Sequence, residues 1–169
     1  GVAGQGNVVT SLLICNALAN EGYMVTFGQS YPAQQRGGPV INYIRVSKEI
    51  QASPIIPEGR ADVIVAMEPV EAMRMLHQYG NPDVITMEKL MGDIASLSGK
   101  TWVVKASEEA HDLGNPIMAN VILVGALVGS GVLPLDREIM EPVLEERFPK
   151  ALDINMKALD KGIELMEQY

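Results

Sequence analysis

Three glycine-rich stretches hold the residues best suited to bind a ligand, and the first is GVAGQGNVVT at residues 1–10. Its glycines are followed at once by helix-forming residues, and backbone N–H groups at a helix start can bind an anion. A dinucleotide fingerprint requires G-x-G-x-x-G, whereas the spacing here is G-x-x-G-x-G, with Ala3 at the second glycine position. We therefore interpret the stretch first as a tight strand-to-helix turn. A dinucleotide site and a site for another anion are the alternatives, with Gln5 and Asn7 as the side chains able to hydrogen-bond a ligand.

The second stretch, QSYPAQQRGGPVINYIRVS, places Arg36 before Gly37, Gly38 and Pro39, directly ahead of a predicted strand. A guanidinium beside an open, glycine-rich backbone can clamp a carboxylate or a phosphate. Arg36 could equally pair with an acidic residue across a subunit interface. The sequence leaves these two roles open.

The third stretch, SPIIPEGRADVIVAMEP, contains an apolar strand that ends at Glu68 and Pro69. Ligands of open α/β sheets gather at the carboxyl ends of the strands, which makes Glu68 a candidate site residue. An acidic residue at that position could also stabilise the start of the following helix through the helix dipole.

The sequence lacks the usual catalytic sets. Neither His77 nor His111 has a partner at metal-ligand spacing, and neither Ser11 nor Ser30 lies in a nucleophile elbow. The single cysteine, Cys15, cannot form a disulfide within the chain and is too few for a Cys-ligated cluster. We expect no metal bound by this chain and a reducing, cytoplasmic location.

Composition excludes two classes of partner. The 169 residues are 47% hydrophobic and 20% charged, which predicts one globular domain over residues 1–169. The net charge of −8 and the scattered Lys and Arg argue against nucleic acid. The longest apolar run, residues 121–128, is shorter than the ~20 residues of a membrane span and predicts a buried core helix.

No targeting segment is visible, and we expect the natural chain to have residues upstream of Gly1.

The order of predicted elements indicates the fold class. Periodicity and caps predict helices over 7–20, 68–80, 108–113, 117–128, 137–147 and 151–166, and strands over 23–29, 40–47, 61–67, 83–86 and 101–106. Strands that alternate with helices predict an α/β fold, a three-layer α/β/α arrangement with a mostly parallel central sheet and a helical C-terminal third. Segment 61–67 is apolar on both faces and is predicted to be a central strand.

Taken together and in this order, GVAGQG, QSYPAQQRGG, SPIIPEGRADVIVAMEP, LGNPIMAN and NMKALDKG resemble the gamma subunit of the 2-oxoacid:ferredoxin oxidoreductases. That family includes enzymes for pyruvate, ketoisovalerate, 2-oxoglutarate and indolepyruvate, and the resemblance runs from Gly1 to about Gly162. It implies a subunit, inactive alone, of an enzyme that oxidatively decarboxylates a 2-oxoacid. Such an enzyme transfers the acyl group to coenzyme A and the electrons to ferredoxin. We expect 2-oxoglutarate as the substrate.

The resemblance also implies partners and site residues. Thiamine diphosphate and iron–sulfur clusters are expected in the alpha, beta and ferredoxin-like delta subunits, with coenzyme A as co-substrate and external ferredoxin as acceptor. No catalytic residue is assigned to this chain. Residues that the resemblance marks as ligand or interface contacts are Gly4, Gln5, Gly6, Gln35, Arg36, Gly37, Gly38, Gly114, Asn115 and Asn120, to which the turn itself adds Asn7.

Two departures from the family pattern accompany the resemblance. The strand expected before Gly1 is not in the sequence, and the segment from Tyr79 to Val84 is shorter than in relatives. The competing interpretation is a free-standing, Rossmann-like nucleotide-binding domain of a dehydrogenase.

Overall fold

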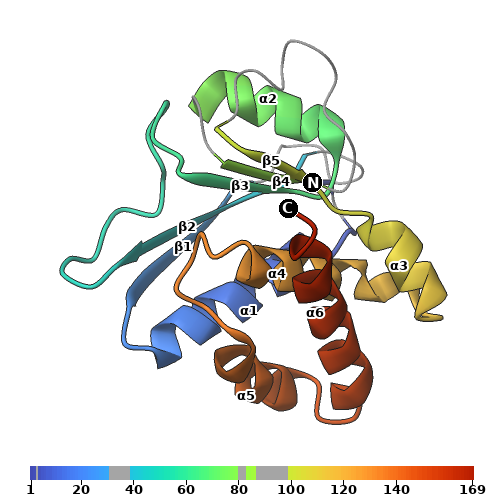
Figure 1. Ribbon diagram of the computed structural model, residues 1–169. Helices are drawn as coiled ribbons and strands as arrows, with labels where there is room; N and C mark the ends of the chain where they lie inside the picture. The colour runs from blue at the N-terminus through green and yellow to red at the C-terminus, as the bar shows by residue number, and fades with distance from the viewer. Residues whose placement is uncertain (3, 31–38, 80–82, 87–98) are drawn as a thin grey trace.

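The computed structural model describes residues 1–2, 4–30, 39–79, 83–86 and 99–169. Helix α2 lies on one face of a small sheet, and α4 and α6 lie on the opposite side, so the predicted α/β class and its layers are confirmed (Figure 1). The described elements are α1 (Asn7–Asn20), β1 (Met24–Ser30), β2 (Ile41–Ser47), β3 (Val63–Ala66), α2 (Pro69–Tyr79), β4 (Asp83–Thr86), β5 (Thr101–Val103), α3 (Ala106–Asp112), η2 (Pro116–Met118), α4 (Ala119–Gly129), α5 (Arg137–Arg147) and α6 (Leu152–Met166).

The five strands form two separate sheets in the described part of the chain. Strands β3, β4 and β5 are parallel, in that order, whereas β1 and β2 form an antiparallel ladder that joins Met24 to Ser47 and Ser30 to Ile41. The expectation of a mostly parallel sheet therefore holds only for the last three strands. Strands β1 and β2 are antiparallel because the connection between them is short. Its ten residues, 31–40, are fewer than a parallel crossover needs.

Strand β3 differs from its prediction as a central strand. Within the described residues it pairs only with β4 and so lies at the edge of its sheet. Its side chains alternate between two apolar clusters: Val63 and Val65 pack on the main core, while Ile64 and Ala66 pack on a smaller core with α2. The apolar pattern of β3 thus reflects two covered faces and does not report two paired edges.

Caps explain where the helices begin and end. Helix α1 has the predicted bounds, with Gly6 before it at φ 76° and Gly22 after it at φ 80°, both in the left-handed region that favours glycine. Helix α5 also has the predicted bounds, and the Asp136 carboxylate accepts a hydrogen bond from the backbone N–H of Ile139 at 2.9 Å. The strand predicted over 101–106 ends early, at Val103, because Ala106 already begins α3.

Helices α4 and α6 build the centre of the main core. Residues 121–128 are all buried, as predicted for a core helix. In the described residues, no helix combines the length and apolar character that a membrane crossing requires. The two helices approach so closely at Gly125 and Gly162 that a Cβ on Gly162 would collide with the carbonyl oxygen of Ile122 and lie 2.7 Å from the nitrogen of Ala126.

We predict that Gly162→Ala destabilises the protein despite the higher helix propensity of alanine. The added methyl group would push two helix backbones apart, and overpacking of this kind costs about 1–3 kcal/mol. Urea unfolding measures the loss. The matched control is Lys157→Ala, at an exposed position of α6, which should stay within about 0.5 kcal/mol of the natural chain. Equal stability of both variants would contradict the close contact.

Candidate functional site

The glycine turn before α1 is hydrogen-bonded to both sheets. Gly1 and Val40 exchange backbone hydrogen bonds, from Val40 N to Gly1 O at 2.7 Å and from Gly1 N to Val40 O at 3.3 Å. The side-chain oxygen of Gln5 accepts from the backbone N–H of Val2 at 2.9 Å, and its amide nitrogen donates to the carbonyl oxygen of Met67 at 3.5 Å. The turn therefore links the start of β2 to the end of β3.

A second set of amide contacts fixes the first turn of α1. Asn7 Nδ2 donates to Val2 O at 2.8 Å, and Asn42 Nδ2 on β2 donates at 2.9 Å to both Asn7 O and Ser11 Oγ. Asn42 Oδ1 is buried without a partner among the described residues. Sequence reasoning missed Asn42; its signal was an amide between two apolar residues, Ile41 and Tyr43, at the start of a strand. Gln5 and Asn7, predicted as ligand contacts, each form a hydrogen bond with the backbone of Val2 in the turn.

The starts of α1 and α4 meet at a contact that joins two predicted site residues. Gly6 is the N-cap of α1, no side chain caps that helix in the described residues, and the Asn120 side chain fills the space beside Gly6 where a Cβ would lie. Asn120 belongs to the first turn of α4, which begins at Ala119. The uncapped N–H groups of α1 form the positive end of a helix dipole, which favours an anion.

The remaining candidates are held in local structure or are not described. Asn115 Oδ1 accepts from the backbone N–H of Ile117 at 3.2 Å and so caps η2, after Gly114 at φ 77°. Gly4 has φ 95°, with open space around it. The residues Gln35, Arg36, Gly37 and Gly38 lie outside the described part of the chain.

Glu68 lies at the carboxyl end of β3, where it caps α2. Its Oε2 accepts a hydrogen bond from the backbone N–H of Glu71 at 2.7 Å. Glu71 is itself buried and forms an ion pair with Arg74 at 3.2 Å. Two roles were considered for Glu68, and this hydrogen bond is the contact expected of a residue that stabilises the start of the following helix.

Metal ligation does not fit the described residues. No group of three or more His, Cys, Asp or Glu side chains there is placed to hold a metal ion. Cys15 is buried on α1, and this burial raises the pKa of its thiol to about 11, whereas metal ligation requires the thiolate. His77 and His111 are both exposed.

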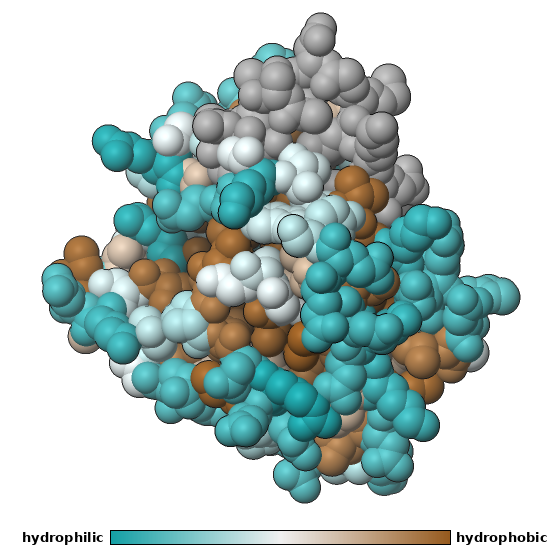
Figure 2. Space-filling view, in the orientation of Figure 1, coloured by the Kyte–Doolittle hydropathy of each residue, from teal (hydrophilic) through white to brown (hydrophobic). Residues whose placement is uncertain are grey.

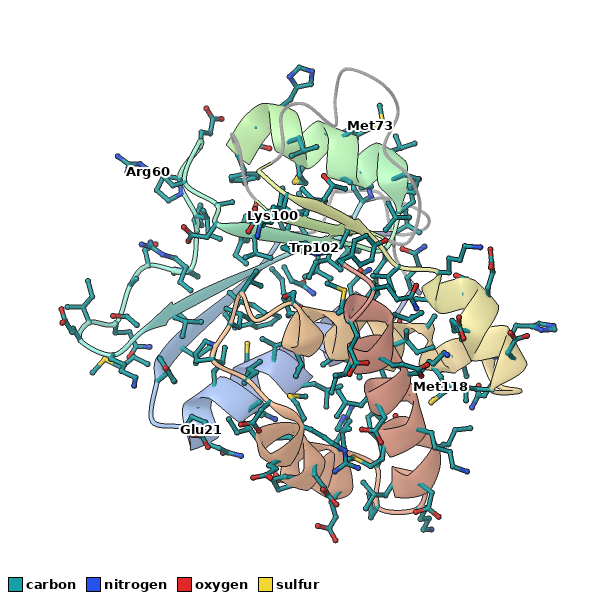
Figure 3. The ribbon with its side chains drawn as sticks, viewed as in Figure 1. Glu21, Arg60, Met73, Lys100, Trp102 and Met118 are labelled. Carbon is teal, nitrogen blue, oxygen red and sulfur yellow. The ribbon has the colours of Figure 1, made fainter. Side chains whose placement is uncertain are left out.

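A groove of about 930 Å³ runs between β2 and β3, lined by residues 40–47 and 60–67. Gly1 and Asn7 lie along it, and Arg60 projects from the loop that joins β2 to β3 (Figure 3). Exposed apolar residues gather in the middle of the face shown in Figure 2, beside the ladder of β1 and β2.

One polar contact closes part of the groove wall. The hydroxyl of Tyr79, at the end of α2, donates to the hydroxyl of Tyr43 on β2 at 3.0 Å, and the two rings meet edge to face. Burial and this hydrogen bond raise the pKa of Tyr79. The phenol therefore stays protonated at neutral pH and joins α2 to the hairpin.

We predict that Gly6→Ala costs more stability than Gly4→Ala. Both variants force a side chain into the left-handed region, at about 1–2 kcal/mol each, but only the Cβ at residue 6 also meets Asn120. Urea unfolding should show a further loss of about 1–3 kcal/mol for Gly6→Ala. Adding Asn120→Ala should remove that further loss, with Asn120→Ala alone as the reference. If Gly6→Ala and Gly4→Ala cost the same, the contact carries no strain.

Comparison with known sequences places the chain among enzyme subunits. Residues 1–165 match the family described as pyruvate ferredoxin/flavodoxin oxidoreductase. Subunit IorB of indolepyruvate oxidoreductase from Pyrococcus horikoshii is 31% identical, in an alignment that covers 99% of this chain and 94% of the relative. Subunit KorC of 2-oxoglutarate synthase from Archaeoglobus fulgidus is 30% identical over 98% of this chain and 84% of the relative.

Solved structures have the same fold. The gamma subunit of a keto/oxoacid ferredoxin oxidoreductase from Geobacter sulfurreducens matches with TM-score 0.77 and 20% identity, over 100% of this chain and 96% of that one. The 2-oxoglutarate:ferredoxin oxidoreductase from Magnetococcus marinus, solved with 2-oxoglutarate, coenzyme A and succinyl-CoA bound, matches with TM-score 0.81 and 21% identity. The match covers 100% of this chain and 30% of that protein. The chain therefore belongs to the pyruvate ferredoxin/flavodoxin oxidoreductase family, and its predicted likeness to the gamma-type subunits of 2-oxoacid:ferredoxin oxidoreductases is confirmed.

Proposed function

We propose that this gamma-type subunit contributes its glycine turn to a composite site shared with partner subunits, where the turn holds an anionic group of coenzyme A or of the 2-oxoacid. The observation that carries the proposal is the uncapped start of α1, packed at Gly6 against Asn120 of α4. Because Gln5 and Asn7 already hydrogen-bond to the backbone of the turn, we assign the contact with the ligand to the backbone N–H groups of α1.

The chemistry of decarboxylation and electron transfer belongs, in this proposal, to the partners. Thiamine diphosphate and the iron–sulfur clusters would lie in the alpha, beta and ferredoxin-like delta subunits, and external ferredoxin would accept the electrons. The donor set described above supports this division, since Cys15 is buried and protonated. The cytoplasmic location predicted from the sequence stays a prediction.

Exposed apolar side chains support a role as a subunit. Ile50 and Ile55 in the loop between β2 and β3 are each 65% exposed, and Ile117 in η2, close to the candidate site in sequence, is 72% exposed. Large apolar side chains that are exposed on an isolated chain are often buried in protein interfaces. A free-standing dehydrogenase domain, the alternative weighed from the sequence, would leave them uncovered.

Two substrate classes are candidates within this function. The sequence predicts 2-oxoglutarate, and the relative KorC supports it. Four archaeal relatives named as indolepyruvate oxidoreductase subunits are 29% to 32% identical, and the chain covers 90% or more of each. We propose an aryl 2-oxoacid of the indolepyruvate type first and 2-oxoglutarate second.

The test is reconstitution of the enzyme with and without this chain. Thiamine-binding and cluster-bearing subunits from the same organism should reduce ferredoxin, in the presence of 2-oxoacid and coenzyme A, only when this chain is added. We expect kcat/KM for indolepyruvate to exceed that for 2-oxoglutarate by about tenfold or more. The reverse ratio would select 2-oxoglutarate. Thermal stabilisation by NAD or FAD without any assembly would support the dehydrogenase domain instead.

In the same complex, Arg36→Ala tests whether the QRGG loop touches a ligand. Loss of a charge-assisted hydrogen bond should raise KM for coenzyme A or for the 2-oxoacid about tenfold. Arg147→Ala, at an exposed position of α5, is the matched control and should leave both constants unchanged. Unchanged KM values in a complex of normal mass would indicate that Arg36 does not contact either ligand and has only a structural role.

A further inference from the structure

The turn between α3 and α4 presents a large apolar side chain to solvent. Ile117, in η2, is 72% exposed, whereas the next residue, Met118, is 7% exposed and packs in the main core. Because Met118 takes the inward position, Ile117 points away from the core. Beside the end of α3, near the label of Met118 in Figure 3, a hydrophobic spot is bordered by hydrophilic residues in Figure 2. Folding of this chain therefore leaves most of the Ile117 side chain in water.

Short-range hydrogen bonds hold the backbone around Ile117 in place. The N–H of Asn115 donates to the carbonyl oxygen of Ala110 at 3.0 Å, and the N–H of Met118 donates to that of Asn115 at 2.9 Å. The Asn115 side chain accepts from the N–H of Ile117 itself at 3.2 Å, and the φ angle of Pro116 is fixed by its ring. Binding costs less conformational entropy when the contacting backbone is already ordered. The turn is thus a preorganised support for an apolar contact.

Ile117 lies next to the candidate anion site. Helix α4 follows η2 without a gap, and residues three apart on a helical stretch are neighbours, with Cβ atoms about 5–6 Å apart. Ile117 and Asn120 are such a pair, and Asn120 contacts Gly6 at the start of α1. A protein that covers Ile117 therefore reaches the border of the site proposed for the glycine turn.

The charge around Ile117 limits what can cover it. Residues 106–169 contain twelve Asp and Glu but five Lys and Arg, so they carry seven of the eight net negative charges of the chain. Helix α3 packs against η2, and its Glu108 forms an ion pair with Lys105 at 3.1 Å. Asp112, exposed at the end of α3, has no ion pair within the described residues. The border of Ile117 on this side is acidic, and interfaces match such a border with positive charge.

We propose that Ile117 and the exposed face of α3 form the surface on which a partner subunit docks to complete the composite site. The partner surface that fits is an apolar pocket for Ile117, bordered by Lys or Arg side chains that face Asp112. A second copy of this chain fits less well, because a symmetric dimer through this face would bring two acidic α3 helices together. The inference rests on the proposed function, which supplies the partner.

Binding of the purified thiamine-binding subunit to this chain, measured by biolayer interferometry, tests the apolar contact. Ile117→Asp removes that contact and adds a charge that the interface would have to bury, so Kd should rise about thirtyfold or more. Asn16→Asp adds the same charge at an exposed position of α1 and should leave Kd unchanged. Ile117→Leu should keep Kd within about tenfold of the natural value. All three variants should melt with the natural chain, because both positions are exposed.

A charge reversal tests the acidic border separately. Asp112→Lys should fold normally, since a cation at the end of a helix interacts favourably with the helix dipole. Its Kd should rise about tenfold at low salt, mainly through slower association, and the difference should shrink at about 0.5 M salt. An unchanged Kd at low salt would contradict the basic border assigned to the partner.

Failure of this inference can be told from failure of the proposed function. If the natural chain binds the thiamine-binding subunit and Ile117→Asp binds it equally well, the docking surface is wrong and the proposed function stands. If the isolated chain is a dimer that Ile117→Asp converts to monomers, a second copy covers this surface and the inference is again wrong. If the natural chain does not bind the thiamine-binding subunit at all, the proposed function fails and the docking surface with it.

Discussion

Residues 1–2 and 4–7 hold the two sheets and the first helix in one arrangement. Their backbone pairs with Val40 on the hairpin side, and the Gln5 side chain reaches Met67 on the side of the parallel sheet. Asn42 adds two hydrogen bonds from β2 to the first turn of α1. Each such bond contributes only about 1 kcal/mol, but together they fix the position of a helix start relative to both sheets.

In this arrangement the polar side chains of the turn form hydrogen bonds with the protein's own backbone. Gln5 and Asn7 would each recognise a ligand well, yet both bind backbone groups of the turn itself. What the turn offers a ligand besides these engaged side chains is its backbone N–H groups and a favourable dipole. A turn built in this way suits a site completed by other protein surfaces.

Local signals predicted the helices well and strand pairing poorly. Gly22 after α1 and Asp136 before α5 mark helix ends through their own conformation or side chain, so the predicted bounds agree with the structure. An apolar run such as β3, in contrast, reports how many of its faces are covered. Pairing depends on which other strand edge lies nearby, and that information is spread over distant residues. The sequence could therefore predict the layers of the fold but could not order all of its strands.

The candidate site shows the same division between local and distant information. Whether Glu68 caps a helix or binds a ligand could not be predicted from its place at the end of β3, since both roles need that place; the structure shows the capping contact, from Glu71 N to the Glu68 carboxylate. The contact between Gly6 and Asn120 joins two stretches far apart in the sequence, and neither stretch alone predicts it. Because the Asn120 amide occupies the space that a Cβ at residue 6 would need, any side chain at position 6 requires the Asn120 side chain to move. The glycine of the turn is thus demanded twice, by its left-handed backbone and by a neighbour from another helix.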